Sequence, residues 1–202
     1  MIAFESRWGR HRMLQVAAAA ALAVSYLLVR LGPRAGWLLA ALSGVGLAVA
    51  LPLLGHAAGN AGRMAVHTVH LLGAGLWIGT LAALWVVARI ESCRGGSELA
   101  APALFRQFSI VALSGAVVVL VAGLVASALY VETLSSLWTT GYGRALMLKV
   151  ALVAGIGVCG FVNWRRFGEP GERSTIPPTV PLEVALACAV AFATSVLTEL
   201  EH

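Results

Sequence analysis

The 202-residue sequence has no aspartate and a single lysine, and charged residues make up only 11% of it. Soluble globular domains carry roughly 25% charged residues, so a water-soluble fold is excluded. Without aspartate, and with no serine or cysteine nucleophile beside the histidines, a hydrolytic triad is not predicted, and we do not expect an enzyme. The three cysteines (Cys93, Cys159 and Cys188) lie far apart without CxxC spacing, which argues against a disulfide framework and against a thiolate metal site.

Apolar residues take the place of the missing charge. They make up 59% of the chain, and the mean hydropathy is +0.88. Most of the chain must therefore face lipid. The net charge of +5 comes from arginines at the ends of the apolar runs, where basic side chains contact lipid headgroups and set orientation. Membrane lipid is the expected partner, and nucleic acid is not.

Six apolar runs approach the roughly 20 residues that a spanning helix needs, and Gly-rich or Pro-rich segments separate them. The predicted helices are residues 13–29, 37–54, 65–87, 109–131, 145–164 and 182–197. They predict an all-α polytopic membrane protein, a six-transmembrane-helix bundle that forms a single membrane domain over residues 1–202. The first run has no signal-peptide cleavage site and is predicted to span the membrane, and the terminal Leu200-Glu201-His202 resembles the remnant of an affinity tag.

The arginines also predict an orientation. The connections after the first, third and fifth predicted helices carry eight basic residues, and the opposite side carries six. The positive-inside rule favours the first side as cytoplasmic. His56, His67, Tyr142 and Glu199 are then expected on the outer side.

Three histidines cluster around the start of the third predicted helix. His67 and His70 are three residues apart, so their side chains lie on one helix face, and a Gly-rich connection can return His56 to the same end. Neutral imidazole suits copper and zinc, and Met64 would add a thioether that favours Cu(I). Because an imidazole near lipid is costly without a partner, we predict one shared metal site. The alternative is a set of interfacial histidines bonded to water and to neighbouring carbonyls.

Other polar residues gather at both ends of the predicted bundle. At the outer end, six residues predict either the rim of an ion path or an interfacial anchor: Trp77, Tyr142, Arg144, Met147, Lys149 and Glu199. At the inner end, four residues predict a salt-bridged packing cluster: Arg106, Asn163, Arg165 and Glu183. Within the helices, Gly75-x-x-x-Gly79 and the run Gly155, Gly157 and Gly160 predict close helix packing.

Several short motifs follow one another in a fixed order. They are Gly55-His56, His67-x-x-His70-Leu71, Ala74-x-x-Trp77, Phe105-Arg106-x-Phe108-Ser109, Thr140-x-Tyr142-Gly143-Arg144 with Lys149, Asn163-x-Arg165, Leu182-Glu183 and Leu197-Thr198. This ordered set resembles the copper resistance protein D (CopD) family. The resemblance implies a multi-pass protein of the bacterial inner membrane that serves copper uptake or resistance, often with the periplasmic copper carrier CopC. It also implies that the histidines face the periplasm.

The leading functional hypothesis is a copper-binding transport component that captures Cu(I) or Cu(II) at His56, His67 and His70, with Met64. One alternative is a haem b electron-transfer protein, with His56 and either His67 or His70 as axial ligands. Another is a noncatalytic docking subunit for a periplasmic CopC-like copper carrier. A three-histidine zinc site is chemically acceptable, and the resemblance, not the spacing, favours copper.

Overall fold

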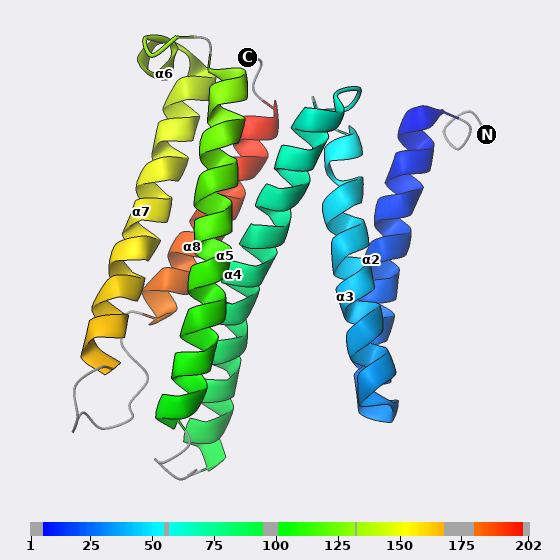
Figure 1. The fold of residues 1–202 in the computed structure, drawn as a ribbon, viewed down its shortest axis with the longest axis vertical. Helices are drawn as coiled ribbons and strands as arrows, with labels where there is room; N and C mark the ends of the chain where they lie inside the picture. Colours follow the sequence, from blue (N-terminus) through cyan, green and yellow to red (C-terminus); the bar gives the residue numbers. More distant parts are fainter. Residues whose placement is uncertain (1–5, 55–56, 95–100, 132, 168–179, 200–202) are drawn as a thin grey trace. The chain divides into compact units, whose positions relative to one another are not determined.

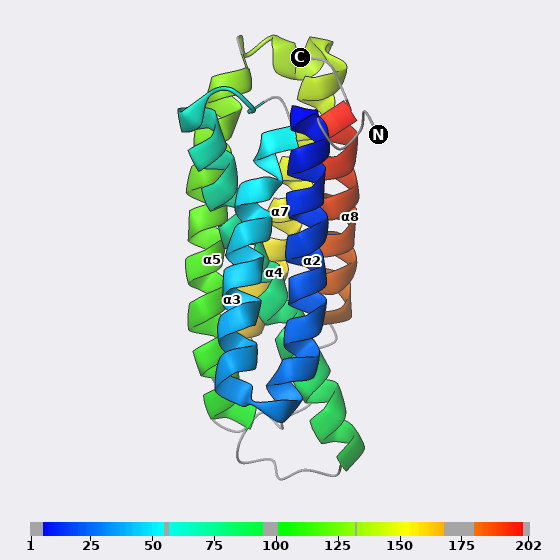
Figure 2. The ribbon, with the colours of Figure 1, turned by 90° about the vertical axis from the view of Figure 1, so that its right-hand side faces the viewer.

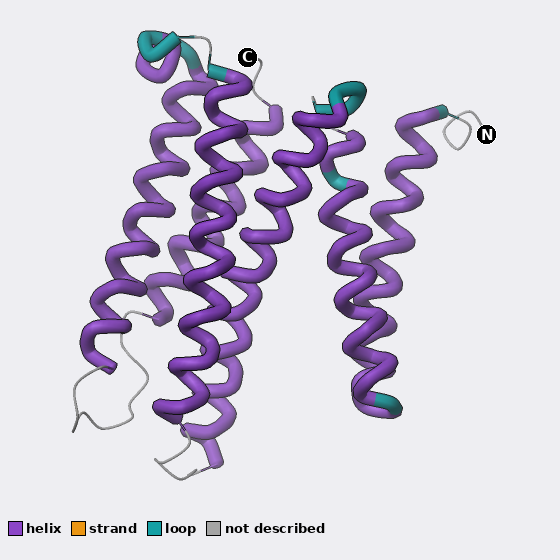
Figure 3. The backbone as a smooth tube through the Cα atoms, viewed as in Figure 1, coloured by secondary structure: helices purple, strands orange, loops and turns teal. Residues whose placement is uncertain are grey.

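The apolar runs form long helices in the computed structural model, which describes residues 6–54, 57–94, 101–131, 133–167 and 180–199. In chain order the elements are α2 (Arg7–Leu31), α3 (Pro33–Ala50), η1 (Pro52–Leu54), α4 (Ala61–Arg94), α5 (Ala101–Tyr130), α6 (Ser136–Thr139), α7 (Gly141–Phe167) and α8 (Val180–Glu199) (Figure 1). Over the described ranges every element is helical (Figure 3). The prediction of an all-α fold is confirmed.

Five of the helices contain stretches long and apolar enough to cross a membrane. These are Gly9–Leu31, Pro33–Leu54, Ala61–Val87, Phe108–Tyr130 and Gly141–Val162. The sixth predicted span corresponds to α8, whose apolar stretch Leu182–Ser195 is shorter. The chain is therefore a polytopic α-helical membrane protein.

The helices belong to two compact units, whose ranges divide α4 and α5. The first unit comprises Met1–Gly73 and Val118–Ala126, and the second comprises Ala74–Val117 and Ser127–His202. The single membrane domain expected from the sequence stays a prediction.

In the first unit, α2 and α3 form an antiparallel pair (Figures 1 and 2). The turn between them is tight because Gly36 has no side chain: a Cβ there would lie 2.6 Å from the Cα of Val29. Farther along the pair, Gln15 is 8% exposed, and its Nε2 donates a hydrogen bond to the backbone oxygen of Ala50 over 3.3 Å. In lipid a backbone carbonyl needs an internal donor, so this bond stabilises the end of α3 where the helix tightens into η1.

In the second unit, α7 packs along α8. The contact face is built from small and branched residues: Ile156 of α7 is 2% exposed, and Ala187 and Ala193 of α8 are 6% and 5% exposed. A Cβ on Gly155 would meet the Cδ1 of Leu186 at 3.6 Å, which is ordinary contact. This pairing buries one face of each helix.

Candidate metal site

The predicted metal-site helix, α4, starts four residues before the predicted boundary, because Asn60 caps it. The Asn60 side-chain oxygen accepts a hydrogen bond from the backbone N–H of Arg63 over 3.0 Å, and its backbone oxygen accepts from the N–H of Met64. Gly59 enters the turn with φ at +97°, a conformation that L side chains rarely adopt. The cap satisfies donors at the start of the helix and places Met64, His67 and His70 in its first turns.

The ring of His70 lies against α5. Its Nδ1 is 3.1 Å from the backbone oxygen of Val119, and both residues belong to the first unit. A carbonyl oxygen only accepts, so Nδ1 carries the proton and donates it. In the neutral imidazole this places the lone pair on Nε2, the nitrogen that a metal ion would bind.

Two glycines make this approach of α4 to α5 possible. A Cβ on Gly73 would lie 2.8 Å from Cγ1 of Val118 and 3.0 Å from the backbone nitrogen of Val119. A Cβ on Gly123 would lie 3.3 Å from Cε1 of His70. In an α-helix the carbonyl of one residue lies beside the side chain four positions later. The missing side chain of Gly123 therefore uncovers the Val119 carbonyl for the imidazole.

His67 precedes His70 by three residues, which corresponds to about 60° around the helix and about 4.5 Å along it. Both histidines and Met64 are half-buried, whereas Val69 and Leu72 between and after them are 47% and 37% exposed. The side chains of Met64, His67 and His70 are thus less exposed than those of Val69 and Leu72 on α4.

His56 lies outside the described residues. Among the residues that the structure describes, which do not include His56, no group of three His, Cys, Asp or Glu side chains could hold a metal ion. Convergence of the three histidines stays a prediction. The part the structure does describe is a histidine pair on one helix face, with one ring oriented by a backbone carbonyl.

The predicted outer rim is described in part. Trp77, Tyr142, Met147 and Lys149 are half-buried, and Arg144 is exposed, with its Nε donating to the backbone oxygen of Thr140 over 3.4 Å. The side chain of Glu199 lies outside the described residues.

The predicted inner cluster centres on Glu183. Among the described side chains it is the one ionisable group that is buried, at 2% exposure, and it lies in the first turn of α8. A carboxylate there is stabilised by the partial positive charge of the helix N-terminus. Arg165 is exposed at the end of α7. The side chains of Arg106 and Asn163 lie outside the described residues, so the ion pair with Glu183 stays a prediction.

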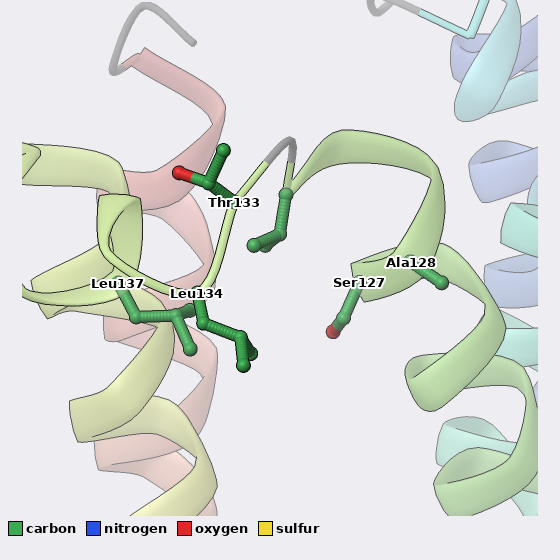
Figure 4. Close-up of a pocket in the computed structure, with 6 residues that line it drawn as sticks. Ser127, Ala128, Thr133, Leu134 and Leu137 are labelled. Carbon is green, nitrogen blue, oxygen red and sulfur yellow. The ribbon is translucent and has the colours of Figure 1, made fainter.

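Two hollows of the second unit are lined by described residues. One, of about 310 Å³, lies between the end of α5 and the α6 segment (Figure 4). Another, also of about 310 Å³, lies between α7 and α8 and is lined by Ala145, Leu148, Leu152, Ala189, Phe192 and Ala193. Neither hollow is lined by a candidate ligand of the metal site.

Fold and site together define a multi-pass α-helical membrane protein with a histidine pair on one spanning helix. Residues 102–197 match the family model described as copper resistance protein D. This match, which covers just under half of the chain, confirms the resemblance to that family noted in the sequence.

A curated relative extends the similarity toward the N-terminus. The chain is 30% identical over 158 residues to the copper transport protein CutJ of Bacillus subtilis (strain 168), and the alignment covers 77% of this chain and 29% of that protein. The chain thus spans less than a third of the length of this relative. Because the alignment covers 77% of the chain, it contains the middle of the chain wherever it begins. The alignment therefore includes positions 56, 67 and 70, which precede the family match. No solved structure matches the chain.

Proposed function

We propose that this chain is the copper-binding part of a copper transport protein of the bacterial inner membrane, and that it does not catalyse a reaction. His67 and His70 capture the ion at the periplasmic end of α4, and His56 and Met64 complete its ligand set. Copper then moves past the rim residues into the membrane and toward the cytoplasm. The ion reaches the site from a periplasmic CopC-like carrier.

The observation that carries this proposal is the orientation of the His70 ring by the carbonyl of Val119. Metal-ligating histidines almost always donate their other ring N–H to a carboxylate, a backbone carbonyl or a water, because this fixes the tautomer and raises the basicity of the ligating nitrogen. A structural histidine would make the same bond. The assignment to copper therefore rests on this geometry together with the family match and the copper transport protein among the relatives.

The ligand types agree with copper as the transported ion. Two imidazoles bind Cu(I) and Cu(II), and a thioether such as that of Met64 adds preference for Cu(I). Met64, His67 and His70 lie in the first turns of a helix with a spanning stretch over Ala61–Val87, which supports a site near one membrane surface. A site at that depth is reached from water without carrying a hydrated ion through the hydrocarbon.

The proposal is tested by copper uptake into proteoliposomes. Liposomes that contain the purified chain should accumulate copper faster than empty liposomes, and His70→Ala should abolish most of the difference. Cys188→Ala is the matched control, because it removes an exposed thiol that is not part of the proposed ligand set and should leave uptake unchanged. Copper binding without uptake would favour the docking-subunit hypothesis.

A further inference from the structure

The connection between α5 and α7 carries two large apolar side chains on its surface. Leu134 is 80% exposed and Trp138 is 66% exposed. Exposed apolar side chains on spanning helices face lipid, but these two lie in a connection, where polar residues are expected. They are four positions apart, with Leu134 just before α6 (Ser136–Thr139) and Trp138 within it.

The α6 turn packs against the first turn of α7, at Gly143. Gly143 is buried, and a Cβ on it would lie 2.5 Å from the Cα and 2.7 Å from the backbone oxygen of Leu137. Gly143 belongs to the spanning stretch Gly141–Val162. The backbone of α6 is therefore in direct contact with the first turn of a helix that contains a spanning stretch.

The hydroxyl groups of this connection bond to the connection itself. The hydroxyl of Ser136 donates to the backbone oxygen of Thr133 over 2.6 Å. Those of Thr139 and Thr140 donate to the backbone oxygens of Ser135 and Ser136 over 3.1 and 2.7 Å. A segment in contact with lipid must satisfy its polar groups internally, because the hydrocarbon supplies no partners. The hydrogen bonds within this connection satisfy its hydroxyl groups in this way.

An apolar hollow of about 310 Å³ opens beside the connection. It is lined by Ser127, Ala128 and Val131 at the end of α5 and by Thr133, Leu134 and Leu137 across from them. Figure 4 shows Leu134 and Leu137 on one side and Ser127 and Ala128 on the other. Beside the end of a spanning stretch, the acyl chains of the bilayer are the apolar material at hand to fill this opening.

We propose that the α6 connection is a membrane-interface anchor, in which Leu134 and Trp138 insert into the acyl boundary and a phospholipid acyl chain fills the hollow beside α5. Interfacial segments bury their apolar face about 5–10 Å into this boundary, and tryptophan is enriched there. The anchor fixes the depth of the α5 and α7 ends in the leaflet. It does not depend on copper binding.

The test is fluorescence quenching of the full chain in phosphatidylcholine nanodiscs, with and without bromine at positions 6 and 7 of the acyl chains. The chain has six tryptophans, so the Trp138 signal is the difference between the parent and Trp138→Phe. Trp37, obtained in the same way with Trp37→Phe, is the reference, because it is also 66% exposed and lies inside the span Pro33–Leu54.

The anchor predicts that brominated lipid quenches Trp138 about as strongly as Trp37 and that iodide in the buffer quenches neither. Quenching of Trp138 by iodide but not by brominated lipid would overturn the anchor and identify the surface as one that faces water or a soluble partner.

Occupancy of the hollow is measured by native mass spectrometry of bound phosphatidylcholine. Ala128→Phe should lose one lipid, whereas Ala154→Phe, at an exposed position on α7, should lose none. Equal lipid numbers in both variants would overturn the acyl-chain site.

Discussion

A side chain at position 123 should weaken copper binding without removing any ligand. A Cβ at that position would lie 3.3 Å from Cε1 and 3.5 Å from Nδ1 of His70. Favourable contacts between carbon atoms lie at about 3.5–4.0 Å, so the imidazole of a Gly123→Ala variant must move away by a few tenths of an ångström. In Gly123→Val two further methyl groups increase this displacement.

The hydrogen bond that orients His70 has little tolerance for such a movement. Its donor and acceptor are already 3.1 Å apart, near the upper end of the usual range of about 2.7–3.2 Å, and at about 3.6 Å the bond no longer exists. Loss of the partner that orients a metal-ligating histidine typically lowers metal affinity about 10–100-fold. We expect about tenfold weaker copper binding for Gly123→Ala and a larger loss for Gly123→Val.

The assay is competition for Cu(I) against a chromophoric chelator in detergent, combined with ¹⁵N NMR of the histidine side chains. The parent should show His70 protonated at Nδ1, and Gly123→Val should lose that tautomer. Gly75→Ala is the matched control, because it lies on the same helix as His70 and its Cβ would meet nothing within 4 Å. If folded Gly123→Val binds copper as tightly as the parent, the proposed role of the Val119 carbonyl is wrong.

Three further predictions concern stability, measured by thermal unfolding in detergent. Glu183→Gln removes the charge of a carboxylate that is 2% exposed and should lower the unfolding temperature more than it lowers copper binding; the reverse order would contradict its packing role. Gly36→Leu forces a side chain against Val29 and should cost about 1–3 kcal/mol or more, whereas Gly44→Leu enters open space and should not; equal effects would contradict the tight turn. Gln15→Ala leaves a backbone carbonyl of α3 unsatisfied, which should cost about 1–3 kcal/mol, and an unchanged unfolding temperature would show that the bond does not stabilise the α2–α3 pair.

The helices were predictable because lipid imposes a simple composition on the segments that cross it. The ends of the helices were less predictable, because hydropathy does not identify the residues that cap a helix. The third predicted helix starts at Ala65 by hydropathy, but α4 starts at Ala61, since Asn60 caps it and Gly62 and Arg63 continue the helix into the polar region. The short α6 was not predicted, because four residues between two apolar runs have no detectable period.

The packing glycines were predicted only in part: Gly155 lies at the contact of α7 with Leu186 of α8. The motif Gly75-x-x-x-Gly79 predicts close approach, but a Cβ on either glycine would meet nothing within 4 Å in the described structure. The closest approaches occur instead at Gly36, Gly73 and Gly143. A local motif shows that a helix face is small, but it does not show which face meets a neighbour.

The shared helix face of His67 and His70 was predictable from the sequence, but the hydrogen-bond partner of His70 was not. The spacing of His67 and His70 places them on one face of any helix. The acceptor for His70 is a backbone oxygen 49 residues away, and no side-chain pattern identifies a carbonyl. A small residue four positions after that carbonyl, here Gly123, is the sequence signal that accompanies it.

Elemental analysis together with visible absorption of the detergent-purified chain tests directly whether His56, His67 and His70 bind copper. We expect that the parent retains copper and that the triple variant His56→Ala, His67→Ala and His70→Ala loses most of it. Neither protein should show an intense Soret band. Copper content in the triple variant equal to that of the parent would contradict the histidine site. An intense Soret band in the parent would contradict the copper assignment and identify the histidines as haem ligands.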